Sequence, residues 1–360
     1  MKRAENMRPE GFAHTVNVEA EEGRMDFYGR AGKQHLAPLW RVLGGLVPET
    51  PKPKSVPAIW KYAQVRPYLM EACKLIGAAE AERRVMVLEN PGLPGQSRIC
   101  ESLFAGLQII LPGEIAPAHR HAASALRFII EGKNAWTAVA GERTMMEPGD
   151  FVITPSMTWH DHGSKSDAPM VWLDGLDMHI VNLLSASFRD GYPKKEHPLT
   201  RPERAAEWEF GANLVPVNSS HGSLTSPIFN YPYGKTREAL DGLARIREPD
   251  PWHAHKMKYI NPVNGGWAMP TISTWMQLVP KGFKTRAYRS TDSAIFTVVE
   301  GKGRSTIGSE RFDWGPHDIF IAPSWMAHAH EATQDAVIFI YSDRVVQEKL
   351  DLFRESKEKA

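Results

Sequence analysis

The sequence predicts an all-β fold of two similar domains, preceded by helices and closed by a further helix. Two observations carry this prediction. From residue 102 onward, short apolar runs alternate with turn residues such as Pro112-Gly113 and Glu147-Pro148-Gly149, a pattern that is typical of a β-sandwich or barrel. A second β-region then repeats the first about 169 residues later, which indicates a duplication.

The strands predicted for the first domain are runs of apolar and β-branched residues that are bounded by turn residues. They are Leu103–Leu111, Leu126–Glu131, Ala135–Ala140, Phe151–Thr154 and Met170–Leu173. The repeat is visible in three pairs of segments, with the same offset in the first two pairs and an offset shorter by a single residue in the third. The pairs are Ile109–Gly113 with Leu278–Gly282, Ile130–Asn134 with Val299–Gly303, and Pro148–Ser156 with Gly315–Ser324.

Helices are predicted on both sides of the β-regions. Apolar residues at helical spacing indicate His35–Val47 and Trp60–Ile76, and Pro67 should kink or split the second of these. Lys235–Arg247 is interpreted as a helix between the domains, and Asp343–Glu355 as a closing helix.

The composition is that of an ordinary soluble protein. The chain has 360 residues, 42% of them hydrophobic and 24% charged, and a net charge of +1 that predicts neither a nucleic-acid nor a membrane partner. Met1–Val16 lacks the apolar core of a signal peptide, and no apolar run is long enough to predict a transmembrane helix. The two cysteines, Cys73 and Cys100, fit packing roles in a reducing cytoplasm, where we expect the protein to reside.

Two histidines near the end of an apolar stretch are the main candidates for metal ligands. His119 and His121 are two residues apart, so in a β-strand both point to one face while Arg120 points away. His160 follows a second strand-like run and can supply a third imidazole. Three neutral imidazoles leave a divalent ion its full charge and several open positions, which suits a chelating anionic substrate and one more small ligand.

The repeat supplies an internal control for this site. The positions equivalent to the paired histidines are Tyr288 and Ser290, whereas those equivalent to His160 and its neighbour two residues on are His328 and His330. The second domain therefore keeps one potential ligand, and we expect it to bind no catalytic metal. We interpret His328 and His330 as hydrogen-bonded residues, because buried polar groups are normally paired in that way.

The spacing of these residues resembles the two sequence motifs of the cupins, which are small double-sheet jelly rolls. The matching positions are Gly113, His119, His121, Gly149, Pro155 and His160. Most cupins also carry a glutamate ligand, separated from the second histidine by three or four residues, where this chain has Ala125 and Leu126. A glycine usual in the second motif is replaced by Met157. The missing glutamate points away from manganese cupins and toward three-histidine iron dioxygenases.

Over residues 35 to 350 the chain resembles the gentisate 1,2-dioxygenase family, which includes salicylate and 1-hydroxy-2-naphthoate dioxygenases. The segments that carry the resemblance are Phe104–Gln108, Leu111–His121, Ala125–Phe128, Phe151–Pro155, Trp159–Gly163, Val171–Asp177, Tyr259–Gly266 and Met269–Thr271. The resemblance implies a bicupin homotetramer with Fe(II) in its first cupin, held by His119, His121 and His160. It places Arg83, Gln108, Arg127, His162 and Asp174 near the substrate. It also implies that N-terminal helices reach a neighbouring subunit, which fits Leu39 and Trp40.

With the resemblance, the expected organisation has four parts. These are a mainly helical segment at 1–100, a catalytic cupin at 101–187, an inter-domain connection at 188–250, and a second cupin without a metal site, plus the closing helix, at 251–360.

The residues themselves suggest roles that agree with the resemblance. Arg127 lies in an apolar run, where an inward arginine is costly unless paired, so we interpret it as a clamp for the substrate carboxylate; an ion pair with an acidic neighbour is the alternative. Arg83 is either a substrate contact or a solvated surface residue. Gly106 leaves room for a ring on the face that it shares with Gln108, which either contacts substrate or bonds the backbone.

Two further residues are candidates for proton transfer or orientation. His162 shares a face with His160 if the strand continues, and we interpret it as a hydrogen-bonding or acid–base group rather than a fourth ligand. Asp174 is expected to be buried, where it orients a ligand, contacts a substrate hydroxyl or has a structural role.

The predicted function is cleavage of gentisate by O₂ between its carboxyl- and hydroxyl-bearing carbons, giving maleylpyruvate. The second hydroxyl of gentisate, para to the first, makes its ring a better electron donor than that of salicylate. Salicylate and 1-hydroxy-2-naphthoate are the alternative substrates. A non-catalytic metal- or sugar-binding or storage cupin is less consistent with the three histidines and Arg127, and a zinc isomerase is less consistent with the missing glutamate.

Overall fold

The computed structural model describes residues 18–212, 214–218 and 223–357, and it divides into residues 1–50 and residues 51–360. The expectation of no signal peptide concerns Met1–Val16, which lie outside the described residues. The first unit contains helices α1 (Val18–Lys33) and α2 (Leu39–Leu46). The prediction of a helix within His35–Val47 is confirmed by α2, whereas the mostly polar sequence of α1 gave no apolar stripe to predict it from. None of the described helices is long and apolar enough to cross a membrane.

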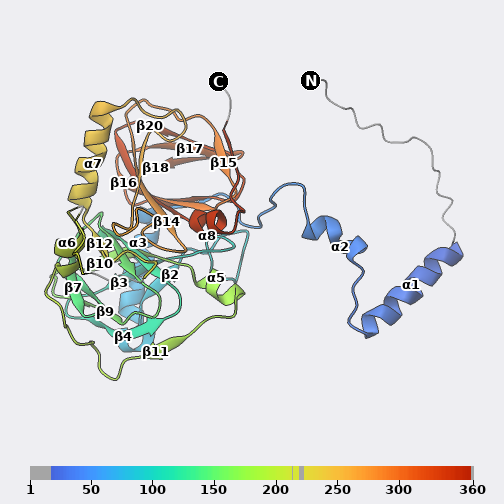
Figure 1. The fold of residues 1–360 in the computed structure, drawn as a ribbon, viewed down its shortest axis with the longest axis horizontal. Coiled ribbons are helices and arrows are strands. Elements are labelled where there is room, and N and C mark those ends of the chain that lie inside the picture. The colour runs from blue at the N-terminus through green and yellow to red at the C-terminus, as the bar shows by residue number, and fades with distance from the viewer. Residues whose placement is uncertain (1–17, 213, 219–222, 358–360) are drawn as a thin grey trace. The chain divides into compact units, whose positions relative to one another are not determined.

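The second unit is a pair of β-barrels (Figure 1). The strands of the first barrel are β2 (Val85–Val87), β3 (Phe104–Ile110), β4 (Ile115–His121), β5 (Ala125–Glu131), β6 (Ala135–Val139), β7 (Glu142–Met146), β8 (Phe151–Thr154), β9 (His160–Ser164), β10 (Met170–Leu176), β11 (Arg189–Gly191) and β12 (Asn230–Tyr231). Those of the second barrel are β1 (Ala58–Trp60), β13 (His255–Lys258), β14 (Ser273–Val279), β15 (Tyr288–Ser290), β16 (Ala294–Glu300), β17 (Gly303–Ile307), β18 (Glu310–Trp314), β19 (Ile319–Ala322), β20 (His328–Ala332), β21 (Ala336–Ser342) and β22 (Glu355–Lys357).

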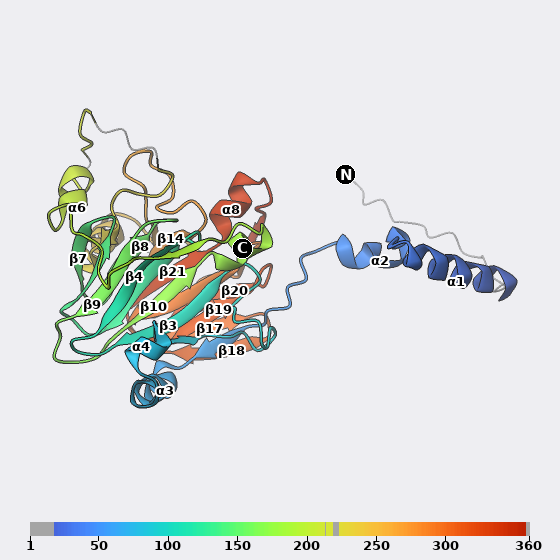
Figure 2. The ribbon, with the colours of Figure 1, turned by 90° about the horizontal axis from the view of Figure 1, so that it is seen from below.

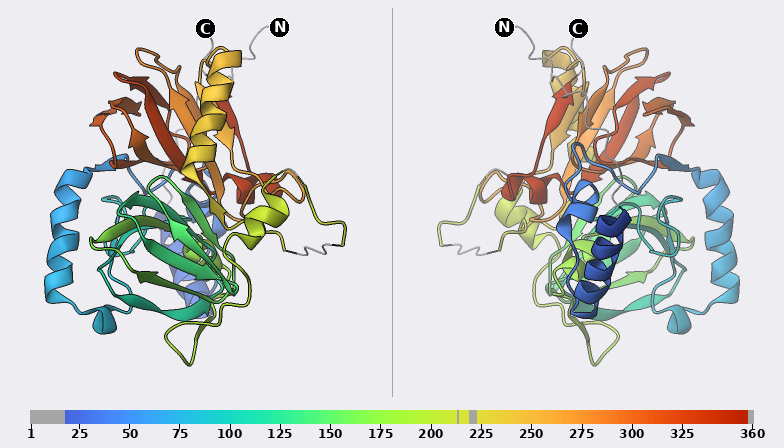
Figure 3. Two further views of the ribbon diagram at one scale, coloured as in Figure 1. Left: turned by 90° about the vertical axis from the view of Figure 1, so that its left-hand side faces the viewer. Right: turned by 90° about the vertical axis from the view of Figure 1, so that its right-hand side faces the viewer.

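Helices flank the barrels and join their parts. They are α3 (Tyr62–Leu75), α4 (Ala78–Ala81), α5 (Met178–Leu183), α6 (Ala205–Phe210), α7 (Tyr233–Ile246) and α8 (Arg344–Lys349). The predicted helix Trp60–Ile76 is confirmed as α3, which contains Pro67, and Lys235–Arg247 is confirmed as α7. Figure 3 shows α3 alongside the first barrel and α7 alongside the second.

Each barrel combines a six-stranded and a five-stranded sheet, and the two barrels match strand for strand. The first has the orders β12-β8-β5-β10-β3-β2 and β11-β4-β9-β6-β7. The second has β1-β19-β16-β21-β14-β13 and β22-β15-β20-β17-β18. Equivalent strands keep the offsets of the sequence repeat: β3 begins at Phe104 and β14 at Ser273, and β8 begins at Phe151 and β19 at Ile319. The duplication is therefore confirmed.

The barrels exchange their outermost strands. The short strand before the first barrel, β1, pairs with β19 of the second, and the strand before the second barrel, β12, pairs with β8 of the first. A helix follows each exchanged strand, and a buried carboxylate of the barrel that the strand joins accepts a hydrogen bond from the first backbone N–H of that helix. The Tyr62 backbone N–H donates to Asp318 (2.9 Å), and the Tyr233 N–H donates to Asp150 (2.8 Å). Neither six-stranded sheet is complete without the chain segment that precedes the other barrel.

Two predicted segments differ from the structure. The closing helix expected over Asp343–Glu355 ends at Lys349, because the chain turns back and β22 pairs with β15. The segment 188–250, interpreted as an inter-domain connection, contains β11, α6 and β12 before the predicted helix α7, and β11 pairs with β4. Both differences involve edge strands of two or three residues, which are too short to show a hydrophobic period.

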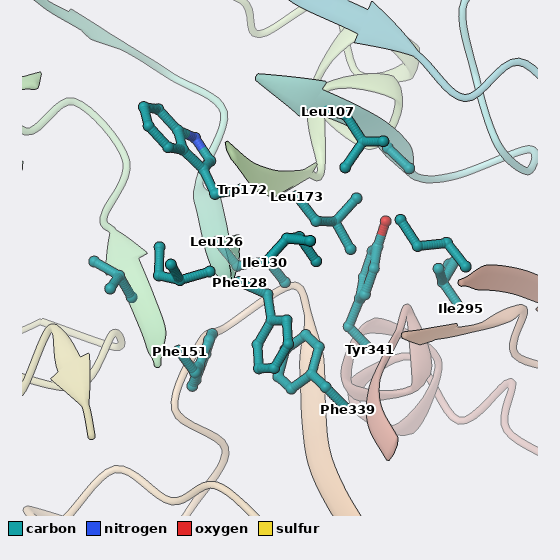
Figure 4. Packing of buried hydrophobic residues seen from close by; sticks show 14 of the residues in the cluster. Leu107, Leu126, Phe128, Ile130, Phe151, Trp172, Leu173, Ile295, Phe339 and Tyr341 are labelled. Carbon is teal, nitrogen blue, oxygen red and sulfur yellow. The ribbon is translucent and has the colours of Figure 1, made fainter. Parts of the chain in front are cut away.

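The core between the barrels is built from the outer faces of the two six-stranded sheets. Figure 4 shows Phe128 of β5 packed against Phe339 of β21, with Leu126 and Leu173 close by. The two phenylalanine rings are stacked with their centroids 4.2 Å apart, and both side chains are fully buried. Figure 2 shows the strands of the two barrels lying side by side. Since successive strand residues point to opposite faces, Arg127, which lies between Leu126 and Phe128, points into the first barrel.

This shared core predicts that the barrels unfold together. Phe339→Ala should lower the free energy of unfolding by about 3–5 kcal/mol, because it empties a fully buried position in contact with both sheets. Denaturant unfolding, followed by far-ultraviolet circular dichroism and by tryptophan fluorescence, measures the change. Trp208→Ala, which removes a side chain that is 68% exposed, is the control and should change the free energy by about 0.5 kcal/mol or less. Two separate transitions in the Phe339→Ala variant would contradict a shared core.

Candidate metal and substrate site

Three histidines from the five-stranded sheet meet inside the first barrel. His119 and His121 come from β4 and His160 from β9, and the register of the two strands places His119 opposite His160. Their ligand atoms all lie within 4.8 Å of one another. Among the described residues, this is the one group of three or more histidine, cysteine or carboxylate side chains close enough to hold a metal ion. The structure therefore brings together the three ligands that the sequence predicted.

Backbone carbonyl groups orient all three imidazoles. Nδ1 of His121 lies 2.6 Å from the Ala123 carbonyl oxygen, and Nδ1 of His160 lies 2.9 Å from that of Thr158. Nδ1 of His119 lies 3.2 Å from the Pro117 carbonyl oxygen. A carbonyl accepts only from a protonated nitrogen, so the contacts of His121 and His160 leave each Nε2 with a free lone pair. Nδ1 of His119 also lies 2.7 Å from Nη2 of Arg83, which is a donor. Nε2 of His160 is buried with no hydrogen-bond partner, as expected of an atom that is placed to bind a metal.

The surroundings keep the three rings neutral, which metal binding requires. Burial, followed by the charge of Arg83, lowers the pKa of His119 to about 3. Burial also lowers the pKa of His121, and it lowers that of His160 to well below the ordinary value. The charge of Arg127, which strand alternation points into the same barrel, contributes in each case. The neutral imidazoles, with the free Nε2 atoms of His121 and His160, fit a divalent transition metal.

The opposite, six-stranded sheet carries the candidate substrate residues. Its register places Arg127 of β5, Asp174 of β10 and Gly106 of β3 in one row across three strands. The next row holds Gln108 of β3 beside Trp172 of β10. The metal ligands thus come from one sheet and the predicted substrate contacts from the other.

Arg127 is 3% exposed and only partly neutralised. Its Nη1 donates to the Thr154 hydroxyl (2.5 Å), and its Nε lies 3.5 Å from Asp174 Oδ1 without forming a hydrogen bond. Asp174 Oδ1 instead accepts from Trp172 Nε1 (3.0 Å). Burial raises the pKa of Asp174 to about 6, although the charge of Arg127 opposes the shift. The two roles considered for Arg127, a carboxylate clamp and an ion pair, are thus compatible. The ion pair with Asp174 orients the guanidinium, which retains hydrogen-bonding capacity.

Gly106 lies where a larger residue would not fit without movement. A Cβ atom there would stand 2.5 Å from Val85 Cγ1 of β2 and 3.0 Å from the Phe104 ring. The absence of a side chain therefore keeps this part of the sheet clear beside Arg127 and Asp174.

Adjacent arginines on the segment before β2 have different environments. Arg83 reaches the metal site, where its Nη2 donates to the Pro117 carbonyl oxygen (2.8 Å) and lies 2.7 Å from Nδ1 of His119. Burial, followed by the charge of Arg127, lowers the pKa of Arg83 to about 9. Arg84 points the other way and pairs with Glu114, the second residue of the first histidine motif.

His162 is fully buried on the face of β9 that it shares with His160, so the predicted continuation of the strand is confirmed. Its Nδ1 lies 2.9 Å from the Thr137 hydroxyl, which in turn donates to the Asp161 carbonyl oxygen (3.3 Å). The hydroxyl therefore accepts from Nδ1–H, and Nε2 of His162 keeps its lone pair without a protein partner. Burial lowers the pKa of His162 to well below its ordinary value. This ring is therefore neutral, and its Nε2 can accept a hydrogen bond.

The second barrel keeps two hydrogen-bonded histidines, and aromatic side chains fill the remainder of its interior. His330 lies 2.7 Å from the Ser305 hydroxyl and His328 lies 3.4 Å from the Met326 carbonyl oxygen, so both have the hydrogen bonds that the sequence predicted. At the position equivalent to Gly106 stands Trp275, and at that of Arg127 stands Phe296, both buried. These aromatic rings occupy the interior that polar residues line in the first barrel.

Sequence reasoning missed the residues that orient the site. Thr137 and Thr154 bond His162 and Arg127, but isolated threonines in strands carry no distinctive pattern. A signal was present for Thr137, because its position in the repeat is Ser305, another hydroxyl. Met157, where cupins usually have glycine, adopts a left-handed backbone with φ of +54°, and Trp325 at the equivalent position has φ of +62°. The backbone shape that favours glycine is therefore kept in both barrels.

Two barrels with a single three-histidine centre among the described residues define a bicupin with one site that can hold a metal ion, and comparisons with known proteins agree. The cupin-domain family model matches residues 106–176 and 274–342. Gentisate 1,2-dioxygenase 1 of Aquipseudomonas alcaligenes is 52% identical over 96% of this chain and all of that protein. The 5-aminosalicylate 1,2-dioxygenase of a Comamonas species is 35% identical over 90% of this chain and 87% of its own.

A solved structure has the same fold over nearly its whole length. The salicylate 1,2-dioxygenase of Pseudoaminobacter salicylatoxidans, crystallised as an adduct with gentisate, superimposes with a TM-score of 0.89 at 29% identity, covering 99% of this chain and 97% of that one. The chain belongs to the gentisate 1,2-dioxygenase family, and the bicupin fold predicted from its sequence is confirmed.

Proposed function

We propose that this protein is an Fe(II)-dependent gentisate 1,2-dioxygenase, which uses O₂ to cleave the ring between the carboxyl- and hydroxyl-bearing carbons and forms maleylpyruvate. The observation that carries the proposal is the three-histidine cluster facing a buried, incompletely neutralised arginine across one barrel. A site with an all-imidazole metal centre and a carboxylate clamp suits a hydroxybenzoate. The 52% identity to a gentisate 1,2-dioxygenase over 96% of the chain supports the same substrate.

His119, His121 and His160 would hold the iron. Imidazole is a suitable ligand for iron, and the absence of a protein carboxylate leaves the metal's charge for an anionic substrate. Bound Fe(II) supplies a route for electrons from the electron-rich ring to O₂. Both oxygen atoms enter the product, so the reaction needs no other oxidant or reductant.

The protein residues bind the substrate and accept its proton. Arg127 binds the carboxylate, because a guanidinium can hold both carboxylate oxygens at once, and Asp174 and Thr154 fix its direction. His162 accepts a proton at Nε2 from the substrate hydroxyl. Gln108 and Gly106 line the ring, and Arg83, adjacent to His119, contributes a second cation.

Salicylate and 1-hydroxy-2-naphthoate remain alternative substrates within the same chemistry. A relative that is 32% identical over 83% of this chain is a 1-hydroxy-2-naphthoate 1,2-dioxygenase of Nocardioides sp. strain KP7. Gentisate is favoured because its second hydroxyl donates electron density to the ring.

Two further features complete the proposal. The free thiols Cys73 and Cys100 support the cytoplasmic location expected from the sequence. A homotetramer is supported by α2, in which no residue is buried and Leu39, Trp40, Leu43 and Leu46 are each at least 46% exposed. An apolar helix face of this kind is typical of a surface that another subunit covers.

Oxygen uptake with gentisate tests the activity and the ligand set together. After anaerobic Fe(II) loading, the wild type should consume O₂ and form a ring-opened product, followed by ultraviolet absorbance. His160→Ala should lose both bound iron and turnover, whereas His328→Ala, the equivalent change in the second barrel, should retain both. Salicylate and 1-hydroxy-2-naphthoate are measured in parallel. Iron-loaded protein that oxidises neither gentisate nor these acids would refute the proposed function.

The clamp is tested by Arg127→Ala. Loss of a charge-assisted pair should raise KM for gentisate about tenfold to a hundredfold while the iron content stays at the wild-type level. Arg127→Lys keeps the charge but cannot bind two oxygens in the same geometry, so its KM should lie between those of the wild type and Arg127→Ala. Arg304→Ala, on the exposed surface of the second barrel, is the control. An unchanged KM in Arg127→Ala would rule out the clamp.

The tetramer is tested by sedimentation equilibrium. Wild-type protein should have the mass of four chains, and Trp40→Asp with Leu43→Asp should shift the distribution to smaller species, because two charges would be placed on the apolar face of α2. Tyr68→Asp, at a residue of α3 that is 63% exposed, serves as the matched surface control. A wild-type monomer would contradict the proposal.

A further inference from the structure

Residues 188–201, here called the strap, run over the five-stranded sheet that carries the metal ligands. We infer that His197 in the strap is a positioning residue, which holds strand β9 and hence the ligand His160 in place for metal binding. The inference rests on the proposed function, in that it takes His119, His121 and His160 as the metal ligands.

One end of the strap holds β4 by backbone hydrogen bonds. Within the strap, β11 pairs with β4 so that Gly191 lies opposite His119 and Arg189 opposite His121. Beyond β11, the Tyr192 N–H donates to the Ala118 carbonyl oxygen (3.0 Å), and the Ala118 N–H donates to the Lys195 carbonyl oxygen (2.7 Å). The strand segment that carries two metal ligands is therefore fixed by the strap along its outer edge.

The other end of the strap holds β9 through a buried histidine–carboxylate pair. Asp161 lies between His160 and His162, and strand alternation points its side chain away from the metal site. Its Oδ2 accepts from the backbone N–H of His197 (2.9 Å) and from His197 Nδ1 (2.5 Å). Asp161 is 1% exposed and His197 is 7% exposed, so water does not compete for these bonds.

A third contact fixes the tautomer of His197. The backbone N–H of Gly141, in the turn between β6 and β7, donates to His197 Nε2 (3.0 Å). Nε2 is therefore the acceptor and Nδ1 carries the proton that is donated to Asp161. The carbonyl oxygen of Gly141 also accepts from the N–H groups of Thr200 (2.9 Å) and Arg201 (3.1 Å). His197 thus joins β9 to a turn that is itself bonded to the end of the strap.

The pair also connects to His162 through the backbone. The Asp161 carbonyl oxygen accepts from the Thr137 hydroxyl, and that hydroxyl accepts from His162 Nδ1. A displacement of Asp161 would therefore change the hydrogen bond that leaves Nε2 of His162 free as a hydrogen-bond acceptor.

Comparison with the second barrel distinguishes a role of the His197–Asp161 pair in the metal site from a role in the fold. It retains the histidine–hydroxyl pair, since His330 bonds Ser305, and it folds into the same sheet order. At the position equivalent to Asp161 it has Ala329, so it has no counterpart of the carboxylate that His197 binds. The barrel architecture does not require this pair, and the pair occurs in the barrel that carries the three-histidine cluster.

The test compares metal binding and strand protection in His197→Phe and wild type. In metal-free protein under anaerobic conditions, Fe(II) is titrated against a competing chelator, and the Kd of the variant should be about tenfold higher. Amide hydrogen exchange of residues 160–164 in metal-free protein should also be faster in the variant. His197→Asn places an amide N–H near the former Nδ1 position and should recover most of the affinity.

Controls separate positioning from loss of stability. Leu69→Ala empties a buried position on α3 and lowers stability without altering the strap or the ligand strands, so its Fe(II) affinity should equal that of the wild type. If His197→Phe does not fold, Asp161→Asn provides the same comparison, with the same expected loss of affinity. Wild-type affinity in the folded variant, or an equal loss in Leu69→Ala, would overturn the inference. A wild type that binds no Fe(II) would instead refute the proposed function.

Discussion

The alternation of side chains along three strands determines both the core between the barrels and one wall of the site. In β5, β10 and β3, every second residue packs into the core between the barrels, and the residues between them face the interior of the first barrel. Phe128 is stacked on Phe339 of the other barrel, while its neighbour Arg127 faces the histidines. A shift of one residue in register would move the arginine into an apolar core and a phenylalanine into the site. Packing between the barrels therefore fixes the row of Arg127, Asp174 and Gly106 that faces the histidines.

The three histidines are positioned by hydrogen bonds and burial rather than by packing between the barrels. The histidines lie on the five-stranded sheet, on the side of the barrel away from the shared core, and backbone carbonyl groups orient all three rings. Burial then keeps the rings neutral, so a divalent cation can compete for them without first displacing protons. Under the proposed function, the buried cation opposite them, Arg127, would bind an anionic substrate between the two sheets. A protein carboxylate among the ligands would have reduced the positive charge that attracts such a substrate.

Much of this arrangement could be predicted from the sequence because it depends on local patterns. The two-residue spacing of His119 and His121 places both on one strand face, and the repeat showed that Tyr288 and Ser290 replace them in the second barrel. An arginine in an apolar run indicates an inward charge that needs a partner. These inferences need only the period of a strand and the comparison of two similar segments.

The remaining features depend on contacts between distant segments and have no local pattern. The exchanged strands β1 and β12 contain three and two residues, too few to show alternation. Arg83 and Arg84 are indistinguishable in sequence, yet one reaches His119 and the other pairs with Glu114. His197 lies in a polar segment that resembles a linker, and only the folded chain places it against Asp161.

The proposed function requires iron in one barrel of the two, among His119, His121 and His160. X-ray diffraction from crystals of anaerobically Fe(II)-loaded protein, with data collected on both sides of the iron absorption edge, locates the metal. One anomalous peak per chain is expected, centred among these three rings, with none near His328 and His330. An additional peak in the second barrel, or no iron peak among the three histidines of the first, would contradict this expectation.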